Sequence, residues 1–120
     1  MNKIFVALLA IAAALALPYQ GPIVGIYTQD HDSNYTYIAA SYVKFIEMAG
    51  AQVVPIFYKS TEANLKAQLS QINGVLFPGG GMEIDIKNLF TKNADLILNY
   101  AKQQNDAGKV FPIWATCLGH

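Results

Sequence analysis

Four short apolar segments, rich in β-branched and aromatic residues, predict buried strands along the chain. They span residues 22–27, 52–58, 75–77 and 110–115. Pro55 in the second segment cannot donate to a sheet ladder, so this segment is expected at a sheet edge or at a bulge.

Between these segments the apolar positions change to helical spacing. Helices are predicted over residues 37–49, from a cap at Ser60 or Thr61 onward, and over residues 84–105, and glycines follow the first and last. Their apolar faces are formed by Ile38, Tyr42, Phe45 and Ala49, by Leu65, Leu69 and Ile72, and by Leu89, Phe90, Leu96, Ile97 and Tyr100.

Strands and helices alternate with short connections, and this order predicts an α/β three-layer sandwich with a mainly parallel sheet. No repeat, low-complexity tract or linker divides the chain, so one domain is expected. The sequence stops at residues 118–120, directly after the fourth predicted strand. Because doubly wound sheets usually have more strands, we expect the front part of a longer domain, truncated after the strand-to-helix turn.

The first 16 residues have the pattern of a secretory signal peptide. Lys3 is followed by an unbroken apolar run, and Ala14 and Ala16 form a small-x-small cleavage motif before Pro18. The run is shorter than the roughly 20 residues of a membrane span, and a buried helix or an anchor is the alternative. We expect cleavage after Ala16, a mature chain of residues 17–120 and no stable membrane anchor.

Composition narrows the functional classes. The 120 residues include eight Lys, no Arg and eight Asp plus Glu. A neutral chain without Arg is a poor binder of phosphate backbones, so no nucleic acid is expected as a partner. One Cys forms neither an internal disulfide nor a four-thiolate zinc site, and two His argue against a protein-only metal site.

Cys117 follows the fourth predicted strand, with the small residues Ala115 and Gly119 two positions to either side. This is the spacing of a nucleophile elbow, a sharp strand-to-helix turn that lifts a nucleophile out of the sheet. A helix after the turn would favour the thiolate through its N-terminal dipole. The alternative is a buried structural thiol, the more frequent fate of a single Cys.

Three consecutive glycines, Gly79, Gly80 and Gly81, follow the third predicted strand. Their N–H groups could stabilise an oxyanion together with the N–H of Leu118, whereas an ordinary glycine-rich turn is the alternative. The loop has neither the Lys-Ser or Lys-Thr of a Walker motif nor the G-x-G-x-x-G spacing of a dinucleotide-binding loop.

Other polar side chains carry weaker signals. His120 lies three positions after Cys117, which would place it beside the thiol or away from it, so it is a poor candidate for the base. His31 falls in a polar stretch over residues 29–34 that is predicted as a surface loop, and a sequon there makes Asn34 a candidate glycosylation site. Glu83 and Asp85 are predicted at a helix start, and Tyr35, Tyr37 and Tyr42 could line a pocket, although helical spacing favours the core for Tyr42.

Five blocks of the sequence occur in a characteristic order. They are PIVGIYTQ at 22–29, YIAASYVK at 37–44, EMAGA with VPI within 47–56, INGVLFPGG at 72–80 and WATCLG at 114–119. Together they resemble the γ-glutamyl hydrolase family (peptidase family C26) of the class I glutamine amidotransferase-like superfamily, over nearly all of the mature chain. The resemblance implies a flavodoxin-like sandwich that cleaves γ-linked glutamates from folate polyglutamates with a Cys-His-acid arrangement.

Site roles follow from the same resemblance. Cys117 would be the nucleophile that forms a thioester, with oxyanion donors from Gly79, Gly80, Gly81 and Leu118. No metal or organic cofactor would take part. The protein would be secreted or delivered to a lysosomal or vacuolar lumen, and it could form a homodimer.

Two departures from the family pattern keep other functions open. The family usually has Gly in place of Ala115, and its catalytic His and acid lie downstream of residue 120. An inactive short paralogue that binds γ-glutamyl or pterin ligands is therefore one alternative. A glutamine amidotransferase domain is another, against which the signal peptide argues.

Overall fold

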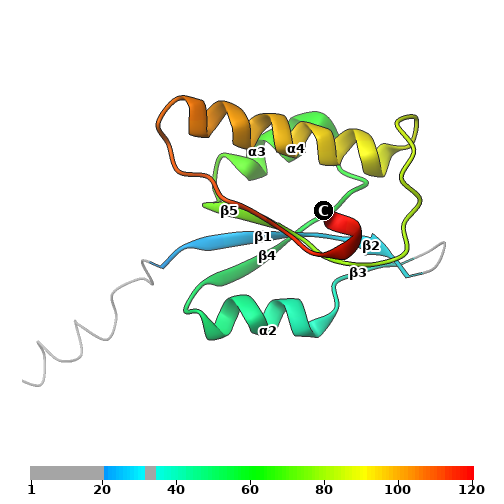
Figure 1. Cartoon of the computed structure of the whole chain (residues 1–120), viewed down its shortest axis with the longest axis horizontal. Coiled ribbons are helices and arrows are strands. Elements are labelled where there is room, and N and C mark those ends of the chain that lie inside the picture. Colours follow the sequence, from blue (N-terminus) through cyan, green and yellow to red (C-terminus); the bar gives the residue numbers. More distant parts are fainter. Residues whose placement is uncertain (1–20, 32–34) are drawn as a thin grey trace, which may run out of the picture.

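Parallel pairing of four strands builds the sheet that organises the molecule (Figure 1). The computed structural model describes residues 21–31 and 35–120; the predicted signal peptide, its cleavage site and Asn34 lie outside the described residues. The strand order is β4-β1-β5-β6, and all three neighbouring pairs are parallel. In that order the strands span Gln52–Ile56, Ile23–Tyr27, Gly74–Phe77 and Ile113–Ala115.

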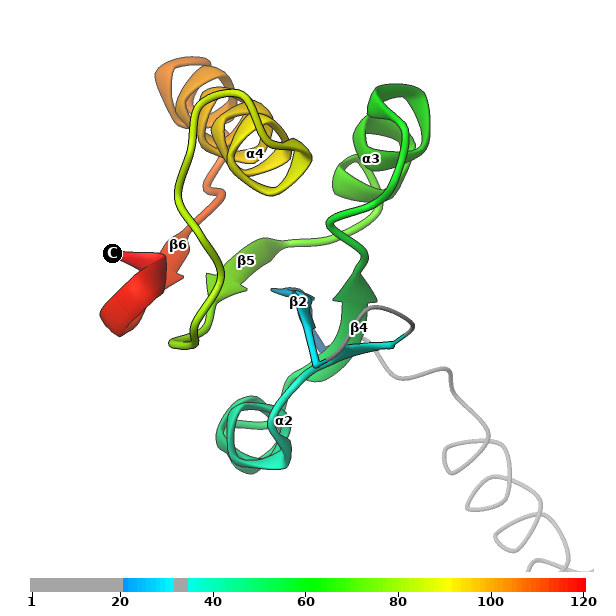
Figure 2. The same cartoon turned by 90° about the vertical axis from the view of Figure 1, so that its right-hand side faces the viewer.

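Helices cover both faces of this sheet, which confirms the predicted three-layer α/β sandwich (Figure 2). α2 (Ala40–Met48) lies on one face, and α3 (Glu62–Leu69) and α4 (Leu89–Asp106) lie on the other. Each helix lies between two parallel strands in the sequence, as crossover connections require. Within the described part of the chain, no helix is long and apolar enough to cross a bilayer.

The main core lies between the sheet and the pair of helices α3 and α4. Leu65 and Leu69 of α3 are buried, as predicted, and Ile72 packs against them from just beyond the helix. The other buried members of this core are Tyr27, Ile56, Tyr58, Val75, Phe77, Phe90, Ile97, Ala101 and Phe111. On the opposite face, α2 has no buried residue, and Phe45 and Ala49 of its predicted apolar face are exposed. The two faces of the sheet are therefore covered unequally.

The first predicted helix is shorter than expected. It begins at Ala40 instead of residue 37, because Tyr37 belongs to β3 (Thr36–Tyr37). β3 pairs antiparallel with β2 (Gln29–Asp30), so the predicted surface loop after β1 is in part a small hairpin. Pro55 lies in β4 at the edge of the main sheet, as its missing N–H predicted.

The long helix predicted from residue 84 begins only at Leu89. Asn88 caps it by accepting the N–H of Thr91 at 2.7 Å. Asp85 accepts the N–H of Lys87 at 2.8 Å in a turn of its own. The placement of Glu83 and Asp85 at the helix start was therefore wrong, because these side-chain bonds hold the preceding segment in a non-helical path.

Candidate functional site

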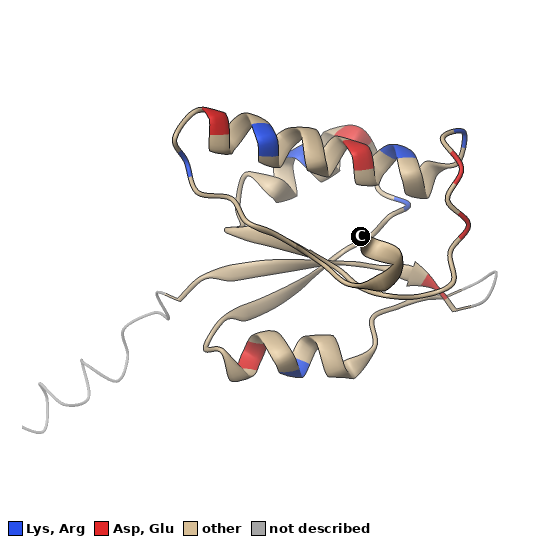
Figure 3. Ribbon diagram, viewed as in Figure 1, with Lys and Arg blue, Asp and Glu red and all other residues tan. Residues whose placement is uncertain are grey.

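The carboxyl ends of the four parallel strands meet at one edge of the sheet, where ligand sites form in open α/β structures. The hairpin strand β2 follows β1, the glycine loop follows β5 and Cys117 follows β6. Among the described residues, the charged ones lie on the helices and loops and on β2, and the four strands of the main sheet contain none (Figure 3). The chemistry of this edge therefore depends on the segments that follow the strands.

Cys117 occupies a turn of unusual backbone geometry directly after β6. Its φ is 51°, and no other non-glycine residue in the described ranges has a positive φ. A side chain in this left-handed region is disfavoured, and such conformations concentrate at functional sites. The thiol is free and exposed, so it is not the buried structural group that was the alternative. The turn has the geometry expected of a nucleophile elbow.

Gly119 allows this turn to lie close to the neighbouring strand. A Cβ at this position would overlap the carbonyl oxygen of Phe77 and lie 2.6 Å from its Cβ. The N–H of Thr116 also donates to the carbonyl oxygen of Phe77 at 3.1 Å. The small residue predicted two positions after Cys117 is therefore required by backbone contact. The 3-10 turn η1 (Cys117–Gly119) includes Leu118, and the first N–H groups of such a turn have no partner inside it.

The glycine loop, residues 79–81, lies against this elbow. A Cβ on Gly79 would be 3.1 Å from the Cβ of Cys117 and 3.1 Å from the hydroxyl of Tyr42. The Gly79 N–H donates to that hydroxyl at 2.9 Å, so it would reach an oxyanion only if Tyr42 released it. Tyr42, for which helical spacing favoured the core, thus presents its hydroxyl to the site. Gly81 has no neighbour within 4 Å of the position its Cβ would take.

Gln29 is part of the site that the sequence reasoning missed. It is only 3% exposed, and its Nε2 donates to the carbonyl oxygens of Pro78 and Gly79, at 3.2 Å each. A Cβ on Gly80 would overlap the Gln29 amide. The one signal in the sequence was the position of this polar residue just after an apolar strand. The prediction instead assigned Gln29 to a surface loop.

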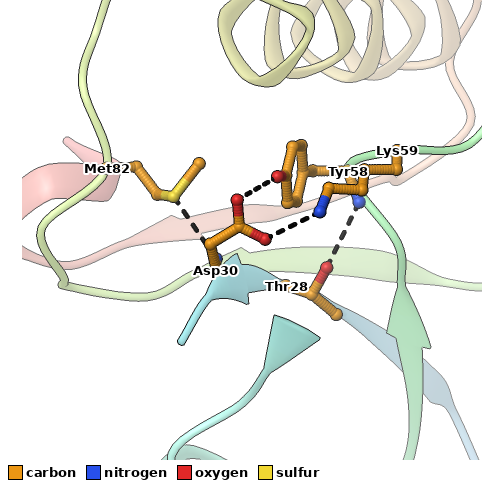
Figure 4. A network of polar contacts seen from close by, with 5 residues as sticks. All are labelled: Thr28, Asp30, Tyr58, Lys59 and Met82. Carbon is orange, nitrogen blue, oxygen red and sulfur yellow. Dashed lines mark hydrogen bonds and ion pairs between the residues drawn. The ribbon is translucent and has the colours of Figure 1, made fainter. Parts of the chain in front are cut away.

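A polar cluster lies beside the glycine loop (Figure 4). The Tyr58 hydroxyl donates to the carboxylate of Asp30, and Lys59 Nζ lies 3.0 Å from the other oxygen of that carboxylate. The Asp30 N–H donates to Met82 Sδ at 3.3 Å, and the Tyr58 N–H donates to Thr28 Oγ1 at 3.2 Å. The cluster therefore connects the segment after β4, the hairpin strand β2 and the residue that follows the glycine loop.

The charges of this cluster are fixed at neutral pH. The hydrogen bond from Tyr58, together with the Lys59 ammonium, holds the pKa of Asp30 below its ordinary value. Burial and the bond to Asp30 raise the pKa of Tyr58, and the bond to Asp30 raises the pKa of Lys59. An ionised carboxylate between two protonated donors suits a structural clamp better than proton transfer.

The histidines do not form a dyad with the thiol in the described part of the chain. His120 contacts Cys117 through the backbone, where its N–H donates to the Cys117 carbonyl at 3.0 Å. The ring of His31 lies 5.5 Å from that of Tyr37, between ring centroids. Across residues 21–31 and 35–120, no three His, Cys, Asp or Glu side chains gather as a metal site requires.

Comparisons with known proteins point to one family. The family model for peptidase C26 matches residues 22–120. The chain is 42% identical over 104 residues to gamma-glutamyl hydrolase B of Dictyostelium discoideum, 45% over 103 residues to gamma-glutamyl hydrolase of Rattus norvegicus, and 43% over 104 residues to that of Homo sapiens. Each alignment covers 82% of this chain and 30%, 32% and 32% of the respective relative, so the chain spans about a third of their length. Five ordered blocks, the α/β sandwich and these matches agree, and the chain belongs to the peptidase C26 family.

Proposed function

We propose that this chain supplies the nucleophile and the oxyanion-binding groups of a γ-glutamyl hydrolase, a cysteine peptidase that cleaves γ-linked glutamates from folate polyglutamates. The left-handed Cys117 at the strand-to-helix turn, in contact with the glycine loop, is the observation that carries the proposal. The substrate class rests on the relatives named gamma-glutamyl hydrolase.

In the proposed reaction the Cys117 thiolate attacks the carbonyl carbon of the γ-linked amide. A C–S bond forms and the carbonyl electrons move to oxygen; the C–N bond then breaks, and the amine of the outgoing glutamate takes up a proton. Water attacks the resulting thioester, which releases the shortened folate carboxylate and regenerates the thiol. The oxyanion of each step would accept from the Leu118 N–H and from the glycine loop. The resemblance places the base and its acidic partner downstream of residue 120.

The test uses the protein as its source expresses it, in wild-type and Cys117→Ala forms. Glutamate release from a folate pentaglutamate is followed by mass spectrometry, and acid-quenched samples are searched for an acyl mass on the Cys117 peptide. We expect the acyl thioester in the wild type and a loss of at least about 1,000-fold in rate for Cys117→Ala, as for other nucleophiles of this type. Unchanged glutamate release by Cys117→Ala would contradict the proposal.

A binding-only role is the second candidate, because the Tyr42 hydroxyl already occupies the Gly79 N–H that an oxyanion would need. This candidate predicts heat of binding for a γ-glutamyl ligand in titration calorimetry without release of glutamate. Turnover by the wild type would exclude it.

Export from the cytosol completes the proposal. The pattern of residues 1–16 and the sequon at Asn34 suit a protein delivered outside the cell or to a lysosomal or vacuolar lumen. The intact mass of the native protein, measured before and after deglycosylation, should give an N-terminus at Leu17 and a glycan on Asn34. Retention of Met1 would contradict export through this segment.

A further inference from the structure

We infer that Gln29 is a positioning residue for the proposed oxyanion site: it orients two consecutive peptide groups of the glycine loop so that their N–H groups face the Cys117 side. The inference rests on the proposed function, because it assigns a catalytic purpose to the loop. Gln29 itself binds the side of the loop that faces away from Cys117, and it acts through the backbone of the loop.

The orientation follows from the two hydrogen bonds of the Gln29 amide. Its Nε2 lies 3.2 Å from the carbonyl oxygens of both Pro78 and Gly79. In a trans peptide group the C=O and the N–H point in opposite directions. The N–H groups of Gly79 and Gly80, which belong to these two peptide groups, therefore point away from Gln29.

The hydrogen bond of the Gly79 N–H shows what lies on the side of the loop opposite Gln29. The Gly79 N–H donates to the Tyr42 hydroxyl at 2.9 Å, and the Cβ that Gly79 lacks would lie 3.1 Å from the Cβ of Cys117. The side of the loop opposite Gln29 is thus the side of the elbow. An oxyanion formed at Cys117 would face the aligned N–H group of Gly80, and that of Gly79 once the Tyr42 hydroxyl releases it. Donors that are oriented before the reaction stabilise such a charge most effectively.

Gln29 is itself held in place. It is 3% exposed, and the N–H of the neighbouring Asp30 donates to Sδ of Met82, the residue that follows the loop. Asp30 is in turn held by Tyr58 and Lys59 (Figure 4). Two consecutive residues of β2 therefore contact the chain at the start of the loop and directly after its end.

The residue type matters at both ends of this contact. Glycines have the greatest backbone freedom, so three in succession need an external constraint to keep one orientation. A primary amide carries two donor hydrogens and can serve two carbonyl oxygens, whereas a carboxylate of the same size only accepts. Gly80 has no room for a side chain, because a Cβ there would overlap the Gln29 amide.

The principal test is Gln29→Glu, which keeps the size of the side chain but removes the donors. The control is Asn105→Asp, because Asn105 Nδ2 also bridges two carbonyl oxygens, those of Ala101 and Phe111 at 2.9 Å each, near the start of β6 and away from the elbow. In ¹⁵N relaxation measurements we expect the order parameters of the Gly79 and Gly80 amides to fall from about 0.85 to below about 0.6 in Gln29→Glu only. We also expect kcat for glutamate release to fall by roughly tenfold to a hundredfold, with KM changed less than about threefold.

A second variant covers the case in which Gln29→Glu does not fold. Gly80→Ala displaces the Gln29 amide from the loop side and should give the same loss of order at Gly79, whereas Gly81→Ala has open space for its Cβ and should not. Unchanged order parameters in Gln29→Glu or in Gly80→Ala overturn the inference, as does a mobile loop with unchanged kcat. A wild type without hydrolysis refutes the proposed function instead, and the relaxation data then still decide whether Gln29 orders the loop.

Discussion

At the scale of single residues, two glycines near Cys117 have different requirements. A Cβ on Gly119 would overlap the carbonyl oxygen of Phe77, whereas a Cβ on Gly81 would have no neighbour within 4 Å. We expect Gly119→Ala to lower the free energy of unfolding by about 2 kcal/mol or more, since the overlap cannot be relieved by rotating a side chain. Gly81→Ala should stay within about 1 kcal/mol of the wild type. Urea unfolding of both variants measures the difference, and equal values would contradict the close packing of the elbow.

The carboxylate of Asp30 should make stability depend on pH in the acid range. Its folded-state pKa lies below the ordinary value of about 3.9, so its contribution is complete above about pH 5 and is lost as the pH falls through the folded pKa. Asp30→Asn should therefore be less stable than the wild type at pH 7, and the gap should narrow by pH 3. Urea midpoints at pH 7, 5 and 3 test this, with Asp95→Asn, an exposed carboxylate of α4, as the control. A gap that is constant over this range would show that the ion pair is not its cause.

Local chemistry made some site residues predictable and left others hidden. Cys117, Gly119 and the glycine loop are visible in the sequence because an elbow and a glycine turn are defined by residues a few positions apart. Gln29 and Tyr42 contact the loop from 50 and 37 positions away, and no local pattern reports such a distance. Their polar atoms contact the loop only in the folded protein, where the sheet places β1 beside β5.

At the scale of elements, the strands were easier to predict than the helix starts. All four strands of the main sheet were located because each is a compact apolar run, although the segments at 52–58 and 110–115 overran β4 and β6. The two-residue strands β2 and β3 were missed. The helix starts depend on which side chain caps first, and an apolar stripe does not report that. Leu89, which is 47% exposed, is the first helical residue because the Asn88 side chain accepts the N–H of Thr91.

The cap of α4 should therefore have a measurable effect. Asn88→Ala removes the acceptor for the Thr91 N–H and the donor to the Glu83 carbonyl, and should cost about 1 kcal/mol of stability. Asn88→Asp keeps the acceptor at the positive end of the helix dipole and should lose less. Thermal unfolding of the two variants under identical conditions compares them. A loss in Asn88→Asp as large as in Asn88→Ala would mean that the bond to Glu83, and not the cap, governs this helix start.

At the scale of the whole molecule, the face under α2 is the weakly covered one. An open hollow of about 380 Å³ lies between α2 and β6, with Phe45, Leu76 and Trp114 in its lining. Trp114 is 60% exposed beside this hollow, and exposed apolar patches favour association between copies. We expect this chain to self-associate with rising concentration in sedimentation velocity, and Trp114→Lys to shift it toward the monomer. Met48→Lys, at an exposed position of α2, is the control and should leave association unchanged; an equal shift in both would mean that net charge, and not the Trp114 side chain, is responsible.

The position of β1 in the sheet has a consequence for the order of events during synthesis. β1 is the first strand of the main sheet to leave the ribosome, yet it ends in the interior, between β4 and β5. Its partners on both sides are made later, and the second of them only after two helices have been translated. Non-local pairing of this kind is slow, and apolar strands are prone to aggregate until their partner strands have been synthesised. The nascent chain therefore has to protect a bare Ile-Val-Gly-Ile-Tyr segment until residue 77 emerges, and this makes early β1 the point at which a chaperone would be needed most.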